Sequence, residues 1–268
     1  MQLGVNVPNF GPGTDPGVLR DWARITEGLG YEILMVSDHV VVTPDVAERY
    51  PEPFYEPFTT LSWLAGVTTR VRLGTTVLIL PYRHPLLVKR MVMNLDRLSG
   101  GRVVLGVGVG WARQEFDALG APFGTRGRVA DEHLATLRDA CRTDGTAIPI
   151  WVGGSSAPAL RRAVRFGDAW HPLRLSLDRM RTVLAEHSLP GFAPRIALRL
   201  TSAPVDDPER PAGVGSIEQI VDDLNQLRQL GAEAVVFDPY HGDPEQTRRP
   251  EEAWRALATV ATYWRTTS

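Results

Sequence analysis

Apolar runs of strand length alternate with segments of helical period along the whole chain. Two apolar runs, residues 71–80 and 103–109, flank an amphipathic segment whose apolar positions Leu87, Met91, Leu95 and Leu98 recur at helical spacing. An apolar strand, an amphipathic helix and a second apolar strand predict a βαβ unit, whose strands belong to a parallel sheet buried on both faces.

The same alternation extends to the end of the chain. The strand pattern occurs at residues 3–7, 33–37, 71–80, 103–109, 148–152, 169–171, 196–201 and 234–237. The helical pattern occurs at residues 15–29, 57–67, 85–98, 127–142, 157–166, 177–187, 216–230 and 250–264. Eight alternating pairs predict an α/β fold, a (β/α)8 TIM barrel, with residues 1–268 as one domain. A doubly wound sheet is the alternative, but residues 9–13 do not match its glycine fingerprint.

Two polar stretches are longer than ordinary connections between these elements. Residues 45–55 are rich in Pro and Glu and follow the second predicted strand, so we expect a long loop that covers the catalytic face. Residues 204–214 form a second long loop after the seventh strand.

Composition narrows the possible functions. The chain has 268 residues, 43% hydrophobic and 22% charged, with a net charge of -2, which gives no support to nucleic-acid or membrane binding. The strand pattern begins at residue 3 and no apolar run reaches the length of a membrane span, so we expect a cytoplasmic protein without a targeting peptide. A single cysteine, Cys141, excludes a disulfide framework, and the single lysine, Lys89, is predicted mid-helix, which argues against Schiff-base chemistry.

The end of the second predicted strand carries Asp38 and His39. In a barrel, side chains that follow the strands gather at the catalytic mouth. His39 is therefore a candidate proton donor or acceptor, and Asp38 a neighbour that could orient it. A histidine that only packs at the barrel mouth is the equally open alternative. Three other strand-end histidines are weaker candidates: His84, His171 and His241.

Gly153, Gly154, Ser155 and Ser156 lie between the fifth predicted strand and the helix that follows it. Glycines let the backbone approach a ligand closely, and a helix start offers free N–H groups, so phosphate is the expected ligand. Arg161 and Arg162 follow nearby and strengthen that interpretation. An ordinary turn with a serine cap remains the alternative.

The fourth predicted strand alternates Gly with Val from Gly106 to Gly110. Glycine at every second position removes side chains from one face, which makes room for a flat ligand or for tightly packed backbone. Thr75 and Thr76 of the preceding strand could form hydrogen bonds at the same depth.

Several catalytic motifs are missing from the sequence. There is no HxH or HExxH pattern, no glutamate at the end of the fourth strand and no GxSxG elbow. These absences argue against a metal hydrolase, a carboxylate-pair glycosidase and a serine hydrolase, and no metal site is expected.

In combination, the motifs resemble those of the luciferase-like monooxygenase superfamily, specifically its branch of oxidoreductases that use the deazaflavin coenzyme F420. The matching segments are residues 37–39, 74–81 with Arg83 and Pro85, 95–102, 106–111 with Glu115 and Phe116, 150–154 and 167–170. The likeness is specific from position 3 to about position 170 and fades afterwards, where only the barrel periodicity continues.

The resemblance implies a barrel that binds a flavin-like ring across its carboxyl mouth. In the family, a bulge in the third strand, often with a non-prolyl cis peptide, backs the ring; here it would fall at Thr75, Thr76 and Val77, with Gly108 beside it. Residues 153–155 would hold the cofactor phosphate. His39 would be the proton-transfer residue near the redox face, positioned by Asp38.

Two features depart from the family pattern. Val109 stands where some sugar-phosphate dehydrogenases of the branch have a glutamate, so their substrate is not carried over. The segment between Arg142 and Ile150 is short where relatives have an aromatic-rich excursion. We therefore expect an F420-dependent oxidoreductase acting on a small organic molecule, with an FMN-dependent monooxygenase and a non-catalytic flavin-binding barrel as alternatives. By analogy with the superfamily, a homodimer is expected.

Overall fold

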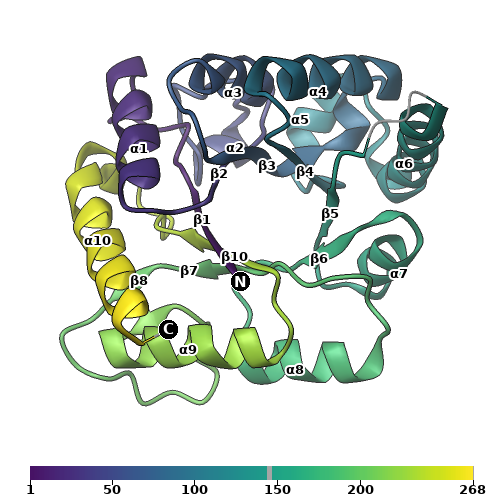
Figure 1. The fold of residues 1–268 in the computed structure, drawn as a ribbon. Helices are drawn as coiled ribbons and strands as arrows, with labels where there is room; N and C mark the ends of the chain where they lie inside the picture. Colours follow the sequence, from purple (N-terminus) through teal and green to yellow (C-terminus); the bar gives the residue numbers. More distant parts are fainter. Residues whose placement is uncertain (144–146, 268) are drawn as a thin grey trace.

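Eight parallel strands form the inner ring of the computed structural model, and helices surround them (Figure 1). The structure describes residues 1–143 and 147–267. The ring is built, in the order in which neighbours pair, from β6 (Ala169–His171), β5 (Ile150–Gly153), β4 (Val103–Gly108), β3 (Arg72–Ile79), β2 (Ile33–Val36), β1 (Gln2–Asn6), β10 (Ala234–Asp238) and β7 (Arg195–Ala197).

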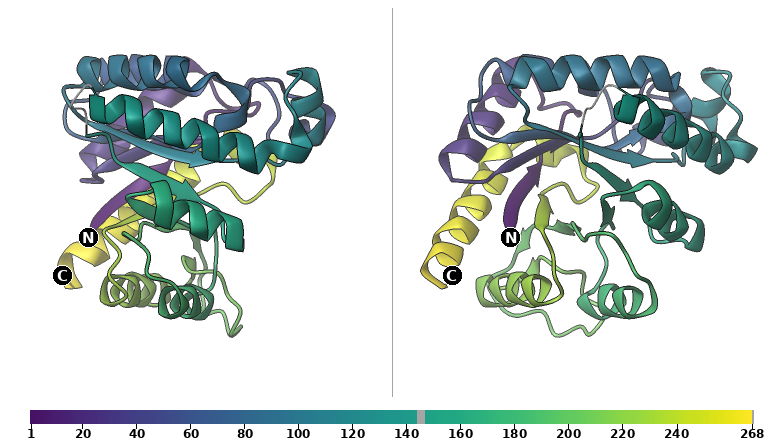
Figure 2. Two further views of the ribbon diagram at one scale, coloured as in Figure 1. Left: turned by 90° about the vertical axis from the view of Figure 1, so that its right-hand side faces the viewer. Right: turned by 45° about the vertical axis from the view of Figure 1, so that its right-hand side comes forward.

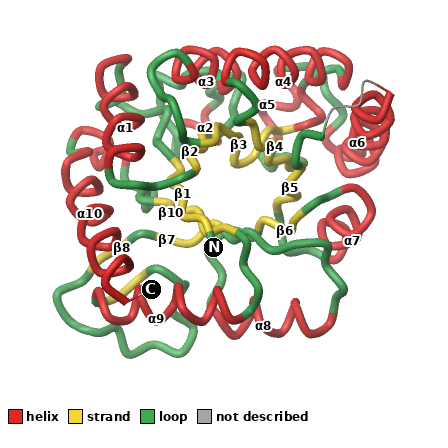
Figure 3. Tube along the Cα trace, in the orientation of Figure 1, coloured by secondary structure: helices red, strands yellow, loops and turns green. Residues whose placement is uncertain are grey.

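The two end strands of this order, β6 and β7, meet through isolated bridges. Trp170 pairs with Phe192 and Leu173 pairs with Arg195, both in parallel orientation. Figure 3 shows the strands as a ring inside the circle of helices. The predicted α/β TIM barrel is therefore confirmed.

The eight predicted helices are all present among the described residues. They are α1 (Pro16–Gly28), α3 (Pro57–Ala65), α4 (Pro85–Ser99), α6 (Arg126–Thr143), α7 (Ala157–Phe166), α8 (Leu177–Glu186), α9 (Ile217–Gln229) and α10 (Pro250–Thr267). Both views in Figure 2 place the two ends of the chain close together. The described part of the chain contains no helix long and apolar enough to span a membrane.

Local sequence explains where these helices start and stop. Ser216 caps α9 in a reciprocal capping box with Gln219, which satisfies two N–H groups that the helix itself leaves open. Helix α4 ends at Gly100, whose φ of 71° is a left-handed conformation that suits glycine. The predicted helix ends are therefore close to the observed ones.

Short elements were missed because their sequences lack a full period of either pattern. They are the helices α2 (Pro44–Ala47) and α5 (Arg113–Ala118), the 3₁₀ turns η1 (Leu80–Tyr82), η2 (Phe123–Thr125) and η3 (Pro244–Arg248), and the strands β8 (Arg199–Leu200) and β9 (Val214–Gly215). Helix α2 opens the stretch expected to be a loop at residues 45–55.

Two sequence-based expectations were wrong in detail. The seventh predicted strand divides, because after Ala197 the chain leaves the barrel and β8 pairs with β9 in a separate small sheet. Helix α4 buries a different stripe from the one expected: Leu87 and Leu98 are 52% and 67% exposed, while Val88 and Val92 face the core together with Leu95. The predicted shortening before β5 includes residues 144–146, which lie outside the described residues.

Apolar side chains form two cores, one inside the barrel and one between the barrel and the helices. The inner core is small and consists of Ile33, Met35, Val104, Trp151, Ala169, Ala193, Ala234 and Val236. The larger outer core covers the strands' other face, so both faces of the sheet are buried as the apolar runs predict. The carboxyl ends of the strands are left to carry polar side chains.

Candidate active site

A buried histidine–glutamate pair lies beyond the carboxyl end of β2. Nδ1 of His39 is 2.6 Å from Oε2 of Glu115, which belongs to α5. The same oxygen accepts a hydrogen bond from the Tyr82 hydroxyl at 2.9 Å, and Oε1 accepts from the backbone N–H groups of Val40 and Val41. With Nδ1 held in this way, Nε2 is the imidazole nitrogen that remains for proton exchange.

The carboxylate of Glu115 stays ionised in this environment. Burial acts to raise its pKa, but the hydrogen bond and charge of His39 and the two backbone N–H groups outweigh burial, so the pKa of Glu115 is lowered. An anionic partner at Nδ1 stabilises the imidazolium form, which is what a base that accepts a proton at Nε2 requires.

Asp38 does not orient His39 by hydrogen bonding, which corrects the sequence-based expectation. Its carboxylate accepts two hydrogen bonds from Arg83, at 2.7 and 2.9 Å, and one from the Ile79 N–H at 2.8 Å. Burial raises the pKa of Asp38, and Arg83 acts against that shift. Asp38 therefore ties the end of β2 to the end of β3, and the partner of His39 is Glu115.

Aromatic rings from the segments after β2 and β4 pack around the imidazole. Tyr50 stacks on His39 with ring centroids 5.5 Å apart, and Phe54 and Trp111 meet it edge-on at 5.4 and 5.8 Å. Tyr50 and Phe54 belong to the stretch at residues 45–55 that was expected to cover the catalytic face. These rings limit the access of water to His39.

Strand β3 carries the bulge that the resemblance implied. The pairing of β3 with β4 shifts register between Thr75 and Leu78, and the peptide bond between Thr76 and Val77 is cis. A bulge at this place re-aims the side chains of the strand beside the barrel mouth.

The alternating glycines of β4 accommodate that bulge. A Cβ on Gly106 would lie 2.0 Å from the carbonyl oxygen of Thr75, and one on Gly108 would lie 2.5 Å from Cγ2 of Val77. A Cβ on Gly153 of β5 would likewise lie 2.9 Å from Val77 Cγ1. Of the two interpretations left open by the sequence, tight packing therefore accounts for Gly106 and Gly108; a direct cofactor contact at Gly108 stays a prediction.

Beneath the mouth, a polar network spans the barrel from β3 to β6 and β7. The Nδ1–H of His171 donates to the carbonyl of Ala193, so Nε2 of the same ring accepts from the Thr76 hydroxyl at 2.8 Å. Burial, with the charge of Arg195, lowers the pKa of His171 to about 4, so the ring is neutral. Arg195 donates to the Thr76 carbonyl at 2.6 Å.

Asp238, at the end of β10, anchors the other side of the network. Its Oδ2 accepts from Arg195 at 2.8 Å and from Arg174 at 2.6 Å, and its Oδ1 accepts from the Asn6 amide at 3.3 Å. Burial raises the pKa of Asp238, but the two guanidinium groups bring it below the usual value. Two arginines on one carboxylate leave a surplus positive charge beneath the mouth.

The diglycine corner after β5 has the conformation that a close-approach turn needs. Gly154 has a φ of +101°, and its carbonyl accepts from the Trp170 indole at 2.8 Å. Ser155 follows, and Ser156 caps α7. Arg162 does not support an anion here, because it turns to Asp131 and to the Gly127 carbonyl.

The structure thus gathers most of the predicted residues at the ends of β2, β3, β4 and β5. Sequence reasoning missed Glu115, Arg195 and Asp238 as functional residues. Glu115 was visible only as part of a family motif without a role, while Arg195 and Asp238 have no local signal beyond their position at strand ends. Within the described ranges, no group of three His, Cys, Asp or Glu side chains could hold a metal ion.

Comparison with known proteins agrees with this architecture. The sequence profile described as luciferase-like monooxygenase matches residues 1–209. The chain belongs to this family. The chain is 33% identical over 180 residues to an uncharacterised protein of Mycobacterium tuberculosis. This alignment covers 55% of the chain and 62% of the relative. The chain thus matches less than two thirds of that relative's length.

Two solved structures share the luciferase-like fold along nearly the whole chain. One is the oxygenating constituent of 3,6-diketocamphane monooxygenase from Pseudomonas putida in complex with FMN, with a TM-score of 0.76, 15% identity and coverage of 97% of this chain and 96% of the other. The second is an F420-dependent secondary alcohol dehydrogenase in complex with an F420–acetone adduct, with a TM-score of 0.71, 15% identity and coverage of 97% and 98%. At these identities the likeness establishes the fold.

Proposed function

We propose that the protein is an oxidoreductase that moves a hydride between coenzyme F420 and a small organic substrate, with His39 as the proton-transfer residue. The observation that carries the proposal is the buried His39–Glu115 pair beside the β3 bulge. Removing a hydride from an alcohol carbon leaves a proton on oxygen, and a base must take it. An imidazole backed by an ionised carboxylate suits that task.

The residues present fit a deazaflavin. The diglycine corner at the start of the ten-residue helix α7 offers backbone N–H groups and the hydroxyl of Ser155 to a phosphate. Thr76 and Val77 would lie against one face of the deazaflavin ring. The Oδ1 of Asn6 is buried without a hydrogen-bond partner among the described residues, as expected of a polar atom in a mouth that receives a polar ligand.

When bound, the deazaflavin would supply hydride chemistry, because it exchanges hydride with a substrate carbon. His39 accepts the hydroxyl proton at Nε2, and Glu115 stabilises the resulting imidazolium through Nδ1. In the reverse direction the imidazolium returns the proton to a carbonyl oxygen. Tyr50, Phe54 and Trp111 exclude water from the imidazole, which strengthens these electrostatic interactions.

The fold similarity to an F420-dependent secondary alcohol dehydrogenase supports a secondary alcohol, or its ketone, as the first substrate class to examine. An FMN-dependent monooxygenase is the second candidate. It is supported by the description of the matching family and by the similarity to an FMN-binding monooxygenase.

Equilibrium binding separates these candidates. Purified protein is titrated with F420 and, separately, with FMN, and each absorbance spectrum is followed. We expect saturable binding of F420, followed by its reduction with at least one member of a secondary-alcohol panel. Tight FMN binding without affinity for F420 would favour the monooxygenase, and binding of either cofactor without any turnover would favour the non-catalytic barrel.

A further inference from the structure

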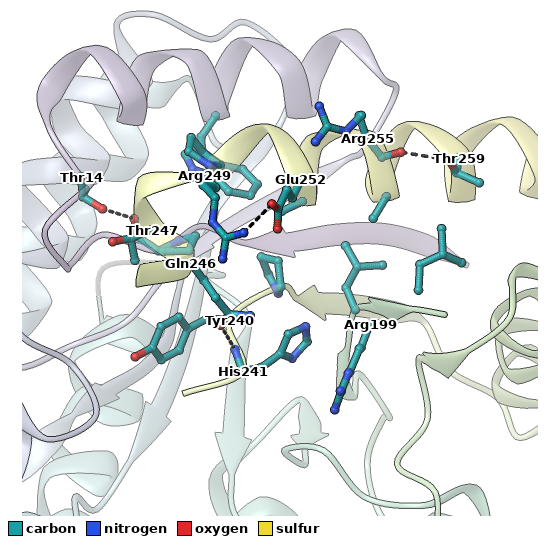
Figure 4. Close-up of a pocket in the computed structure, with 18 residues that line it drawn as sticks. Thr14, Arg199, Tyr240, His241, Gln246, Thr247, Arg249, Glu252, Arg255 and Thr259 are labelled. Carbon is teal, nitrogen blue, oxygen red and sulfur yellow. Dashed lines mark hydrogen bonds and ion pairs between the residues drawn. The ribbon is translucent and has the colours of Figure 1, made fainter. Parts of the chain in front are cut away.

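A cavity lies on the outer side of the mouth, between α10 and the loops that follow β7 and β10. Its volume is about 320 Å³, within the lower range of ligand pockets. Apolar side chains form its floor: Pro8, Trp22, Leu198, Pro239, Ala253 and Ala256. Figure 4 shows Arg249, Glu252 and Arg255 on one side of it, and Tyr240, His241 and Arg199 on the other.

Positively charged side chains outnumber negatively charged ones around this cavity. Arg199, Arg249 and Arg255 line it together with a single carboxylate, Glu252. Glu252 is paired with Arg249 at 2.9 Å, whereas Arg199 and Arg255 form no ion pair with any described residue. The positive end of the 18-residue helix α10, which begins at Pro250, faces the same space. The cavity therefore combines an apolar floor with a positive rim.

The polar wall adds hydrogen-bonding capacity without negative charge. Burial, together with the charges of Arg174 and Arg199, lowers the pKa of His241, so its imidazole is neutral at pH 7. Burial also raises the pKa of Tyr240 to about 12, so this hydroxyl is neutral as well. Neither group cancels the positive rim.

The cavity is separate from the proposed cofactor site. Tyr240 stands between it and His39: its ring contacts Phe10 and Tyr50, and its hydroxyl donates to the Arg49 carbonyl. The diglycine corner follows β5, whereas this cavity is built by the loops after the seventh and eighth strands of the barrel and by the short η3. In TIM barrels generally, the loops after these two strands often hold an anionic group.

We propose that this cavity is a binding site for a small organic anion that is distinct from the redox cofactor. The apolar body of the ligand lies on the floor formed by Trp22, Leu198 and Ala256. Its carboxylate, sulfonate or phosphate head lies at the positive rim of the cavity, where neither Arg199 nor Arg255 forms an ion pair with a described carboxylate.

A pair of fluorescent probes tests the site on the full chain. 8-Anilinonaphthalene-1-sulfonate has an aromatic body and an anionic head, and N-phenyl-1-naphthylamine has the same body without the sulfonate. The titrations use the unchanged protein and the variants Arg199→Gln, Arg255→Gln and Ala256→Phe. Arg90→Gln, which changes an exposed arginine of α4, is the matched control. Circular dichroism checks that each variant is folded.

We expect one sulfonate probe per chain, with affinity reduced about fivefold by each change at Arg199 or Arg255 and unaltered by Arg90→Gln. The uncharged probe should bind equally to these variants, and Ala256→Phe should weaken both probes by filling the cavity. Equal sulfonate affinity in all three arginine variants would overturn the proposal. So would the absence of sulfonate binding to the unchanged protein, or displacement of the sulfonate by saturating F420 or FMN.

Discussion

Nδ1 of His39 lies 2.6 Å from Oε2 of Glu115, although the two residues are 76 positions apart in the chain. Glu115 accepts four hydrogen bonds in all, from His39, Tyr82, Val40 and Val41, and its side chain is fully buried. A glutamine at this position has only one acceptor oxygen, and its NH₂ group would face a group that also donates a hydrogen bond.

Glu115→Gln should therefore destabilise the fold as well as the catalytic pair. We expect a loss of about 2–4 kcal/mol in the free energy of unfolding, because buried donors are left without an acceptor. Urea unfolding measures it. Tyr82→Phe removes one donor and keeps the carboxylate, so it should cost about 1 kcal/mol. Similar losses in the two variants would contradict the role assigned to the carboxylate.

His39→Ala should reduce turnover without preventing cofactor binding. Loss of a general base lowers the rate by roughly 10²–10⁴-fold, so hydride transfer from an active secondary alcohol should fall by that factor while the Kd for F420 changes little. His187→Ala, beyond the end of α8, is the control and should behave as the unchanged protein. Full activity in His39→Ala would remove the proton-transfer assignment.

The sequence predicted the barrel because its signals are local and repeated. Each apolar strand and each amphipathic helix is visible within a window of about 11–18 residues, and their strict alternation leaves few topologies. The buried stripe of α4 was predicted less well. Leu87 is as apolar as Val88, and only the packing against the barrel decides which of the two is buried.

The site was predicted only in part, because the sequence shows which residues are neighbours along the chain but not which become neighbours in space. His39 and the diglycine corner stand next to strand ends and could be recognised there. The partner of His39 could not, since Asp38 is its neighbour in sequence and Glu115 its neighbour in space. The network of Thr76, Arg195 and Asp238 joins three strands that meet only when the barrel closes.

Val77 and Gly108 provide a test of how the glycines of β4 support the bulge. Gly108→Ala places a Cβ 2.5 Å from Val77 Cγ2, and such overpacking should cost about 1–3 kcal/mol. Adding Val77→Ala removes the clashing methyl group, so the double variant should be more stable than the sum of the single changes implies, by roughly 0.5–3 kcal/mol. Urea unfolding of the four proteins gives this coupling.

Gly106→Ala is the matched control for that cycle. There the new Cβ would lie 2.0 Å from the Thr75 carbonyl oxygen, which is backbone and has no side chain to trim. Val77→Ala should not relieve it, and the two changes should add. Equal rescue at Gly106 and Gly108 would show that Val77 is not what the glycine at 108 accommodates.

His171 should make the fold sensitive to acid. Its pKa is lowered to about 4 in the folded protein from an ordinary value of 6.5, chiefly by burial, so the unfolded chain binds the proton more readily. The contribution of the neutral His171 to the free energy of unfolding is therefore complete above about pH 6.5 and is lost as the pH falls towards about 4. In total it is about 3 kcal/mol. Chemical unfolding at pH 7 and pH 4.5 measures the change.

His171→Gln isolates this contribution from the titration of other groups. The amide can still accept from the Thr76 hydroxyl and donate to the Ala193 carbonyl, but it does not titrate. The variant should therefore lose less stability than the unchanged protein between pH 7 and pH 4.5, whatever its stability at pH 7. Parallel losses in the two proteins would mean that the buried imidazole is not the group that takes up the proton.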